Sequence, residues 1–183
     1  MKKRRINKKR VLIFLVVPLL VITAGVTLSF MFKASEEKHN DFIPAQVTCE
    51  VNEVFDGSQK SSITIMNTGN IEAYLRLRLV SYWVDSDGNI VGKESDIPEV
   101  NYDSAYWITN SEDVYYYTAP VMPGMATAHD LLKSPIILEE STYLGKPVYQ
   151  VVEVFAEGVQ SEPSDAVEEA WGVVVSNNSI GLQ

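Results

Sequence analysis

The chain has 183 residues, of which 46% are hydrophobic and 10% aromatic, enough for one domain with a hydrophobic core and too apolar for a wholly disordered chain. Residues 1–33 hold eight Lys and Arg and no acid, so residues 34–183 hold seven basic against 24 acidic residues, a net charge of −17. A body this acidic disfavours nucleic acid as a partner. It leaves open a plain solvated surface or a surface that binds cations.

A basic segment followed by a long apolar run begins the sequence. Residues 1–10 are MKKRRINKKR, and Val11–Phe32 contains no charged residue. As a helix, these 22 residues would span about 33 Å, close to the hydrocarbon thickness of a bilayer. The preceding basic residues place the N-terminus in the cytoplasm and the body outside. The length of the run favours a retained anchor, whereas small residues before Phe30 favour signal-peptide cleavage between Ser29 and Phe30, and both alternatives stay open.

A polar segment separates this run from a region of β pattern. Residues 33–44 predict a linker or an unpaired N-terminal arm, and residues 45–183 an extracellular β domain. Gln46–Phe55 alternates between apolar and polar residues and predicts a strand. Lys60–Trp83 predicts a long hairpin, with its turn at Asn67–Asn70, where Asn and Gly tolerate a positive φ. Apolar residues at the odd positions of the second strand predict its buried face.

The even positions of that second strand carry a different set of side chains. They predict a polar and aromatic face, with arginine stems packed over rings as its simplest explanation. A face that binds a ligand or a polymer is the alternative. The candidate interaction residues are therefore Tyr74, Arg76, Arg78 and Tyr82.

The rest of the chain predicts more strands and one helix. Val148–Glu157 is apolar on both faces, which predicts a central strand, and Lys133–Lys146 is expected to be irregular. Ser164–Gly172 predicts a helix, with Ser164 as its N-cap and Gly172 as its C-cap. A count of about seven to nine strands predicts a jelly-roll or Ig-like antiparallel β-sandwich with one short helix. This domain is expected to be preceded by an N-terminal hydrophobic signal or transmembrane helix. Further short strands are expected at Ile90–Val91, Ala105–Ile108, Val114–Pro120, Thr127–Leu132 and Val173–Val175.

The sequence contains no motif that predicts catalysis, a cofactor or a metal site. The two histidines, His39 and His129, stand in different regions, and neither a zincin helix motif, a nucleophile elbow nor a phosphate loop occurs. Asp85–Asn89 alternates carboxylates as a Ca²⁺ loop does, but it lacks the glycine and glutamate of an EF-hand at the required positions, so a hairpin turn is favoured. The favoured interpretation of His129 and Asp130 is a surface loop, and a pair of metal ligands is the alternative. Cys49, the single cysteine, is expected to be a small buried hydrophobic residue.

Several segments together resemble one group of exported proteins. They are the Thr-Leu-Ser-Phe sequence near the end of the apolar run and the segments Val47–Val51, Ile65–Arg76, Tyr115–Val121 and Asp165–Gly172. This set resembles exported proteins of Gram-positive, clostridia-type bacteria related to the TasA and camelysin family, which a SipW-like signal peptidase processes. The resemblance implies a secreted, jelly-roll-like sandwich built into extracellular matrix fibres, with subunits similar to donor-strand systems. The donor would be Phe30–Ile43, which departs from a good donor strand because Ser35–Asp41 is polar on both faces.

The sequence thus predicts a non-enzymatic exported structural protein of the cell surface or biofilm matrix. If it assembles by strand addition, it would be a fibre subunit. Its partners would be the SipW-like peptidase during export, further copies of itself or related matrix subunits, and the membrane through residues 11–32 if these are retained. The alternative is a membrane-anchored extracytoplasmic binding module that uses the face of Tyr74, Arg76, Arg78 and Tyr82. A metal-dependent hydrolase built on His129 and Asp130 is a third hypothesis.

Overall fold

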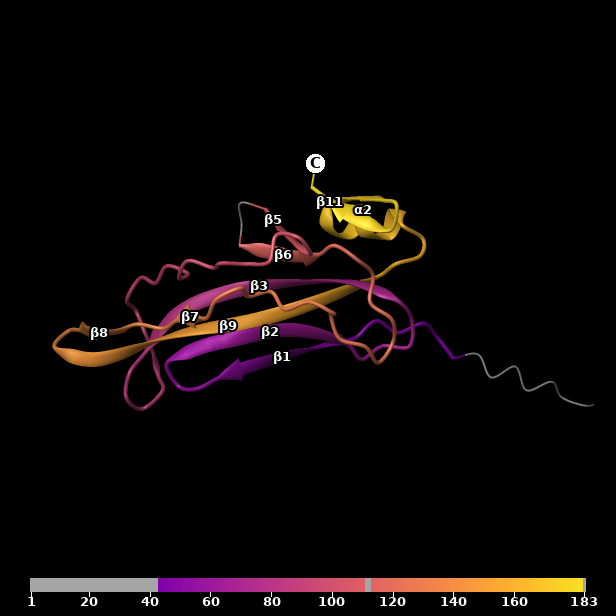
Figure 1. Cartoon of the computed structure of the whole chain (residues 1–183). Coiled ribbons are helices and arrows are strands. Elements are labelled where there is room, and N and C mark those ends of the chain that lie inside the picture. Colours follow the sequence, from indigo (N-terminus) through magenta and orange to yellow (C-terminus); the bar gives the residue numbers. More distant parts are fainter. Residues whose placement is uncertain (1–42, 111–112, 183) are drawn as a thin grey trace, which may run out of the picture. The chain divides into compact units, whose positions relative to one another are not determined.

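The computed structural model describes residues 43–110 and 113–182, and its compact unit begins at Pro44. This part of the chain is mainly β, with antiparallel sheets and one helix, as predicted (Figure 1). The elements in chain order are β1 (Cys49–Phe55), β2 (Gln59–Asn67), β3 (Ala73–Val84), β4 (Ile90–Val91), β5 (Trp107–Thr109), β6 (Val114–Tyr117), β7 (Ile136–Ile137), β8 (Glu140–Tyr143), β9 (Lys146–Gln160), α2 (Asp165–Trp171), β10 (Val174–Ser176) and β11 (Ser179–Gly181).

The strands form three sheets. A large sheet has the order β5-β6-β3-β9-β8, with β4 paired to the end of β3, and a small sheet has the order β1-β2-β7. The strands β10 and β11 pair with each other only. The longest pairing joins β3 and β9 over twelve residue pairs, from Ala73 opposite Gln160 to Val84 opposite Tyr149. Two strands far apart in the sequence therefore form the longest pairing of the large sheet.

The predicted hairpin Lys60–Trp83 is wrong, because its two strands lie in different sheets. β2 belongs to the small sheet and β3 to the large one, so the chain crosses from one sheet to the other between them. Both strands direct apolar side chains into one shared core, which contains Ile63 and Ile65 of β2 together with Leu75 and Leu77 of β3. Alternation of period two predicts the buried face of each strand correctly, but it does not predict which strand lies beside which.

The crossing at residues 67–70 does not use positive φ, contrary to expectation. Gly69 is needed for a different reason: a Cβ atom on it would lie 2.3 Å from the backbone oxygen of Gln46. The segment before β1 runs against the crossing, where Asn70 donates its backbone N–H to the Gln46 oxygen and Gly69 donates its own to Thr48. Asn67 is fully buried, and its Nδ2 donates to the carbonyl oxygens of Ile71 and Val121. The crossing is thus fixed by close backbone approach.

A second, smaller core lies on the other side of the large sheet. Here α2, β10 and β11 cover Tyr74 and Tyr116, with Val167 of the helix and Ile180 of β11 fully buried against them. We call this side of the large sheet, away from the small sheet, its outer face. Tyr115 and Tyr117 lie in the main core, so the three consecutive tyrosines of β6 place rings on both faces of the sheet.

Several predicted elements differ from the observed ones. Thr127–Leu132 forms no strand, although Thr127 and Leu131 donate backbone hydrogen bonds to β2, and Lys133–Lys146 holds β7 and β8 instead of being irregular. Residues 179–181, for which the sequence predicts no strand, form β11. The helix ends at Gly172 with φ of 66°, as predicted for a C-cap, but Ser164 makes no side-chain cap hydrogen bond. Short segments gain their structure here from long-range partners that local patterns do not reveal.

Candidate interaction site

A long stretch of β9 has a strand partner on one side only. Only Lys146–Tyr149 of this strand pairs with β8, so residues 151–160 have β3 on one side and no strand partner on the other within the described part of the chain. Gln150 donates its N–H to Glu139, on the side away from β3, whereas Ser161 donates toward β3, to Glu72. Since N–H directions alternate along a strand, the N–H groups of Val152, Val154 and Ala156 face away from β3. We call this side of residues 151–160 the open edge.

The free edge of β1 lies next to the open edge. Within residues 43–110 and 113–182, β1 pairs only with β2, and a cleft of about 450 Å³ lies between the two sheets at this side. Apolar side chains dominate its walls, and Phe55 of β1 is half exposed. An extended peptide could hydrogen-bond to the open edge and place alternate side chains in the cleft. The lining residues are Val51, Glu53, Phe55, Lys60, Tyr82, Val151, Val152, Glu153 and Val154.

One ion pair lies in the wall of this cleft. The Lys60 ammonium lies 2.6 Å from a Glu53 carboxylate oxygen and 5.4 Å from the centre of the Phe55 ring. Lys60 is 6% exposed, so its charge depends on Glu53 for compensation. The ion pair thus links β1 to β2 in the wall of the cleft through a charged hydrogen bond.

The segment before β1 also comes close to β9. A Cβ atom on Gly158 would lie 2.8 Å from Val47 Cγ1 and 3.1 Å from Leu75 Cδ2. Glycine in the middle of a strand often marks such a close approach. Nearby, Cys49 is half buried beside Val47, and burial, followed by the Glu157 charge, raises the pKa of its thiol. Cys49 therefore behaves largely as the small core residue that the sequence predicts.

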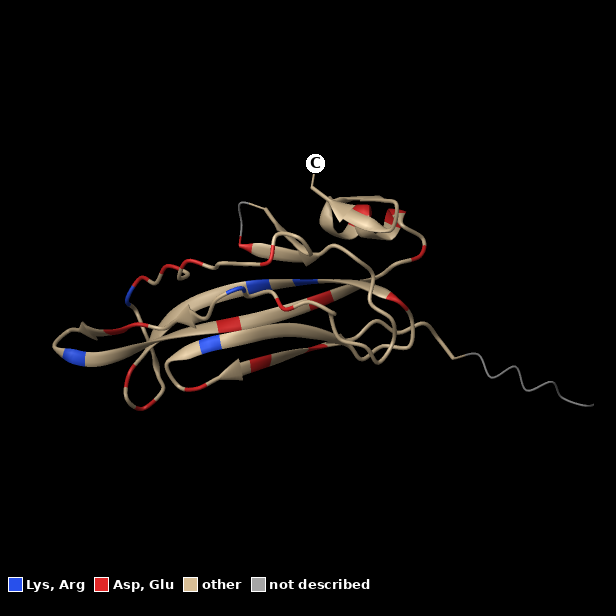
Figure 2. Ribbon diagram, in the orientation of Figure 1, with Lys and Arg blue, Asp and Glu red and all other residues tan. Residues whose placement is uncertain are grey.

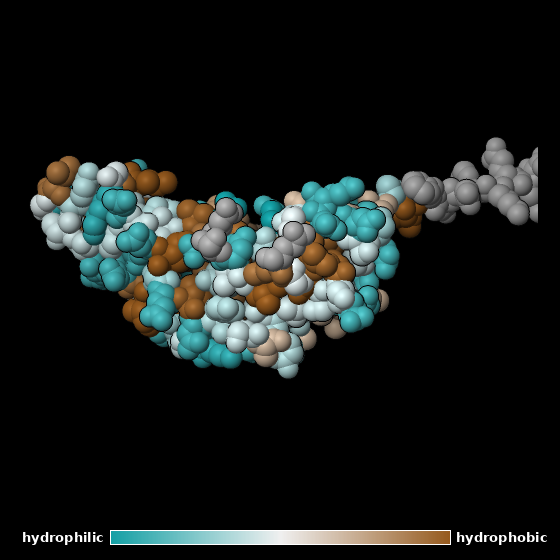
Figure 3. Space-filling model, turned by 90° about the horizontal axis from the view of Figure 1, so that it is seen from above, coloured by the Kyte–Doolittle hydropathy of each residue, from teal (hydrophilic) through white to brown (hydrophobic). Residues whose placement is uncertain are grey.

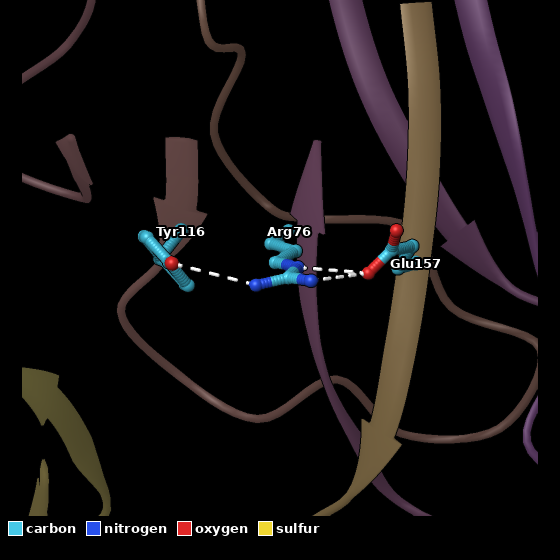
Figure 4. Close-up of polar contacts among 3 residues, drawn as sticks. All are labelled: Arg76, Tyr116 and Glu157. Carbon is cyan, nitrogen blue, oxygen red and sulfur yellow. Dashed lines mark hydrogen bonds and ion pairs between the residues drawn. The ribbon is translucent and has the colours of Figure 1, made fainter. Parts of the chain in front are cut away.

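The predicted face of Tyr74, Arg76, Arg78 and Tyr82 has two halves. Tyr74 is 2% exposed beneath the second core, so it presents no surface to a partner. Arg76 donates to Glu157 from Nε at 2.9 Å and from Nη2 at 2.6 Å (Figure 4). Its guanidinium also lies 4.8 Å from the centre of the Trp171 ring. The ion pair joins β3 to β9, and the contact with Trp171 attaches α2 to the large sheet, so Arg76 has a structural role.

The other half of the face is accessible. Arg78 is exposed, and Tyr82 is half buried, with the pKa of its hydroxyl raised by burial and then by the Glu153 carboxylate. Cross-strand neighbours from β9 extend this half, and Phe155 stands opposite Arg78 with 48% of its surface exposed. The sequence singled out one strand of this face, and its β9 neighbours were missed because register is a long-range property.

The remaining polar candidates serve local structure. Asp85 accepts backbone N–H groups from Asp87 and Asn89, and these bonds, that of Asn89 foremost, lower the pKa of its carboxyl. Asp130 accepts from the Ser62 hydroxyl and from the backbone N–H groups of Ile63 and Leu132, so it ties a loop to β2. His129 stacks on Tyr106 with ring centres 3.3 Å apart.

The residues described here contain no group of three His, Cys, Asp or Glu side chains that could hold a metal ion. Over residues 43–110 and 113–182, no helix is both long and apolar enough to cross a membrane. The proposed cleavage site at Ser29 and Phe30, the apolar run at 11–32 and His39 lie outside the described residues. Figure 2 shows Asp and Glu spread over strands and loops, with few Lys and Arg among them.

Comparison of the chain with protein families, with curated proteins and with solved structures found no match. The interpretation of the site therefore rests on its geometry and on the sequence.

Proposed function

We propose that this chain is a non-enzymatic, exported structural protein of the cell surface or biofilm matrix, whose copies assemble into fibres by strand addition. The open edge of β9 beside the cleft is the single observation that carries this proposal. Among the described residues, this ten-residue stretch of β9 leaves the outward N–H and C=O groups of every second residue without a strand partner. Together with the neighbouring unpaired edge of β1, it forms a template for an added strand. The fold type that we propose is a jelly-roll or Ig-like β-sandwich, consistent with two sheets that share one core.

The resemblance of the sequence to TasA and camelysin relatives supports the same proposal. It implies processing by a SipW-like signal peptidase at Ser29 and Phe30, release of the body outside the cell, and Phe30–Ile43 as the donor segment. The polar character of Ser35–Asp41 means that the donor would gain more from backbone hydrogen bonds to the open edge than from side chains in the cleft.

The first experiment is recovery of the chain from its producing cells, with N-terminal sequencing and measurement of its mass in solution. A chain that begins at or near Phe30 and forms large assemblies, which disappear on deletion of residues 30–43, is the expected result. A full-length, membrane-bound monomer would refute the fibre subunit and favour the anchored binding module. A cleaved chain that stays monomeric at every concentration would also refute assembly.

A substitution on the open edge tests the binding geometry directly. Val154→Pro removes an N–H that faces away from β3, so it leaves the β3–β9 pairing intact while it blocks an added strand. Val154→Ala is the matched control, because it shortens the same side chain and keeps the N–H. Assembly lost in Val154→Pro and kept in Val154→Ala is expected, provided that both variants keep the circular dichroism spectrum of the parent. Normal assembly of Val154→Pro would refute the open edge as the binding site.

A further inference from the structure

The outer face of the large sheet is covered over only part of its length. α2, β10 and β11 cover the part that includes Tyr74 and Tyr116, and this cover ends at the Arg76–Glu157 ion pair. Beyond it, Val80 is 37% and Phe155 48% exposed, and neither side chain belongs to the main core or to the second core. Seen from the side of α2, hydrophobic side chains are exposed in several patches between hydrophilic ones (Figure 3). An apolar sheet surface left in water is a candidate for contact with another molecule.

The register of β3 and β9 arranges four side chains of this uncovered surface as the corners of a square. Arg78 stands opposite Phe155, and Val80 stands opposite Glu153. The two charges therefore lie on one diagonal of the square, and the two apolar side chains lie on the other. Arg78 has no ion-pair or hydrogen-bond partner among the residues that the structure describes, so its charge is available. We call Arg78, Val80, Glu153 and Phe155 the four-residue patch.

This arrangement is complementary to a second copy of itself. A two-fold axis in the plane of contact, along the Val80–Phe155 diagonal, places each of these two residues against its own counterpart. The same rotation places Arg78 of one copy against Glu153 of the other, twice. An interface of this kind is isologous, since one patch forms both sides of it. No other simple face-to-face rotation satisfies both charges at once, because Arg78 would then meet Arg78 or an apolar side chain.

We propose that two copies of this chain bind face to face through the four-residue patch about this two-fold axis. This contact uses side chains of the outer face and no backbone hydrogen bonds, which distinguishes it from strand addition at the open edge. Glu153 is the one residue of the patch that also lines the cleft. It would join copies laterally, whether or not they form fibres. The patch is small compared with stable interfaces, so we expect weak association of isolated copies, strengthened wherever several copies are held in a row.

Charge reversal at the two charged corners gives a decisive test. Arg78→Glu places two glutamates against each other in both contacts of a homodimer, and Glu153→Arg does the same with arginines. We expect each variant alone to weaken self-association about tenfold or more.

An equimolar mixture of the two variants restores opposite charges in both contacts. One contact joins the two substituted side chains, a glutamate at position 78 and an arginine at position 153. The other contact joins the unchanged Glu153 of the first variant to the unchanged Arg78 of the second. The mixture is therefore expected to regain the association of the parent.

Self-association is measured by sedimentation over a concentration series, at physiological ionic strength to screen the acidic body. The chain is used in the form that its producing cells export, in one detergent throughout if residues 11–32 are retained. A change of fold in one chain cannot produce recovery in the mixture, so recovery identifies contact between residues 78 and 153 of different copies. A mixture no more associated than either variant, or variants as associated as the parent, would overturn the proposal. Fibre formation by Arg78→Glu alone, which leaves the lining of the cleft unchanged, would leave the strand-addition proposal standing and so separates the two failures.

Cross-linking provides a second measurement. Val80 lies on the proposed axis, so Val80→Cys in a Cys49→Ser background is expected to form a covalent dimer with a short thiol-reactive cross-linker. Ile137→Cys in the same background is the control, since Ile137 of β7 is more exposed, at 59%, and belongs to the small sheet. Equal dimer yields from the two positions, or none from Val80→Cys, would contradict the two-fold contact.

Discussion

Replacement of Gly69 by alanine tests how the two sheets are joined. The new Cβ would lie 2.3 Å from the Gln46 backbone oxygen and 3.1 Å from the Thr48 nitrogen. Backbone atoms cannot rotate away as a side chain does, so the segment before β1 must move by about 1 Å to reach an ordinary contact. That movement breaks or lengthens the bonds that attach this segment to the crossing.

The magnitude follows from those bonds. The Asn70 N–H donates to the Gln46 oxygen at 3.0 Å, the Gln46 N–H donates to Asn70 Oδ1 at 2.7 Å, and the Gly69 N–H donates to the Thr48 oxygen at 3.1 Å. At about 1 kcal/mol each, their loss lowers the free energy of unfolding by about 2–3 kcal/mol. For a body of this size, the melting temperature would fall by roughly 8–12 °C.

The assay is urea unfolding followed by tryptophan fluorescence, with Gly92→Ala as the matched control. A Cβ on Gly92 would meet only the Tyr143 hydroxyl at 3.8 Å, so this variant should stay within about 0.5 kcal/mol of the parent or be slightly more stable. If Gly69→Ala lowers the free energy of unfolding no more than Gly92→Ala does, the close backbone approach at the crossing does not exist in solution.

Two further predictions concern charge and ionisation. Glu53→Gln leaves the buried Lys60 without a counter-charge and should lower the free energy of unfolding, measured in urea, by about 1–3 kcal/mol. Glu50→Gln, on the exposed side of β1, is the control and should change this free energy by less than about 0.5 kcal/mol. Equal effects of the two substitutions would contradict the buried ion pair. Burial raises the pKa of Tyr115 to about 12. Because the folded state holds this proton more tightly than the unfolded state, the proton's contribution to stability is complete below the unfolded pKa of about 10 and is lost as pH rises toward 12. Tyr115→Phe should therefore flatten the decline of the free energy of unfolding between about pH 10 and pH 12. An unchanged pH profile would contradict the raised pKa.

The sequence predicted the β class, the buried face of β3 and the C-cap at Gly172, because each depends on side chains close together in the chain. Leu75, Leu77 and Leu79 face the core whatever strand lies beside them. The sheet to which a strand belongs depends instead on distant partners, which is why the expected hairpin proved to be a crossing between sheets.

The candidate site was predictable only in part, for the same reason. Arg78 and Tyr82 were singled out by alternation and are accessible, whereas Tyr74, in the same phase, is buried by a helix much later in the chain. β9 was expected to be central because it is apolar on both faces, yet most of one edge has no partner among the described residues. Gly158 was the one local sign of unusual packing near this strand, and it does not by itself indicate an open edge.

The pairing of Ala73 with Gln160 also bears on how the chain folds in time. β3 has its main partner, β9, far along the chain, and its other long-range partner, β6, also lies well beyond it, so the large sheet cannot form from local contacts alone. Folding dominated by such distant pairings takes milliseconds to seconds, far longer than helix formation. If the chain is exported as proposed, β3 and β9 would therefore stay unpaired until both strands have reached the same side of the membrane.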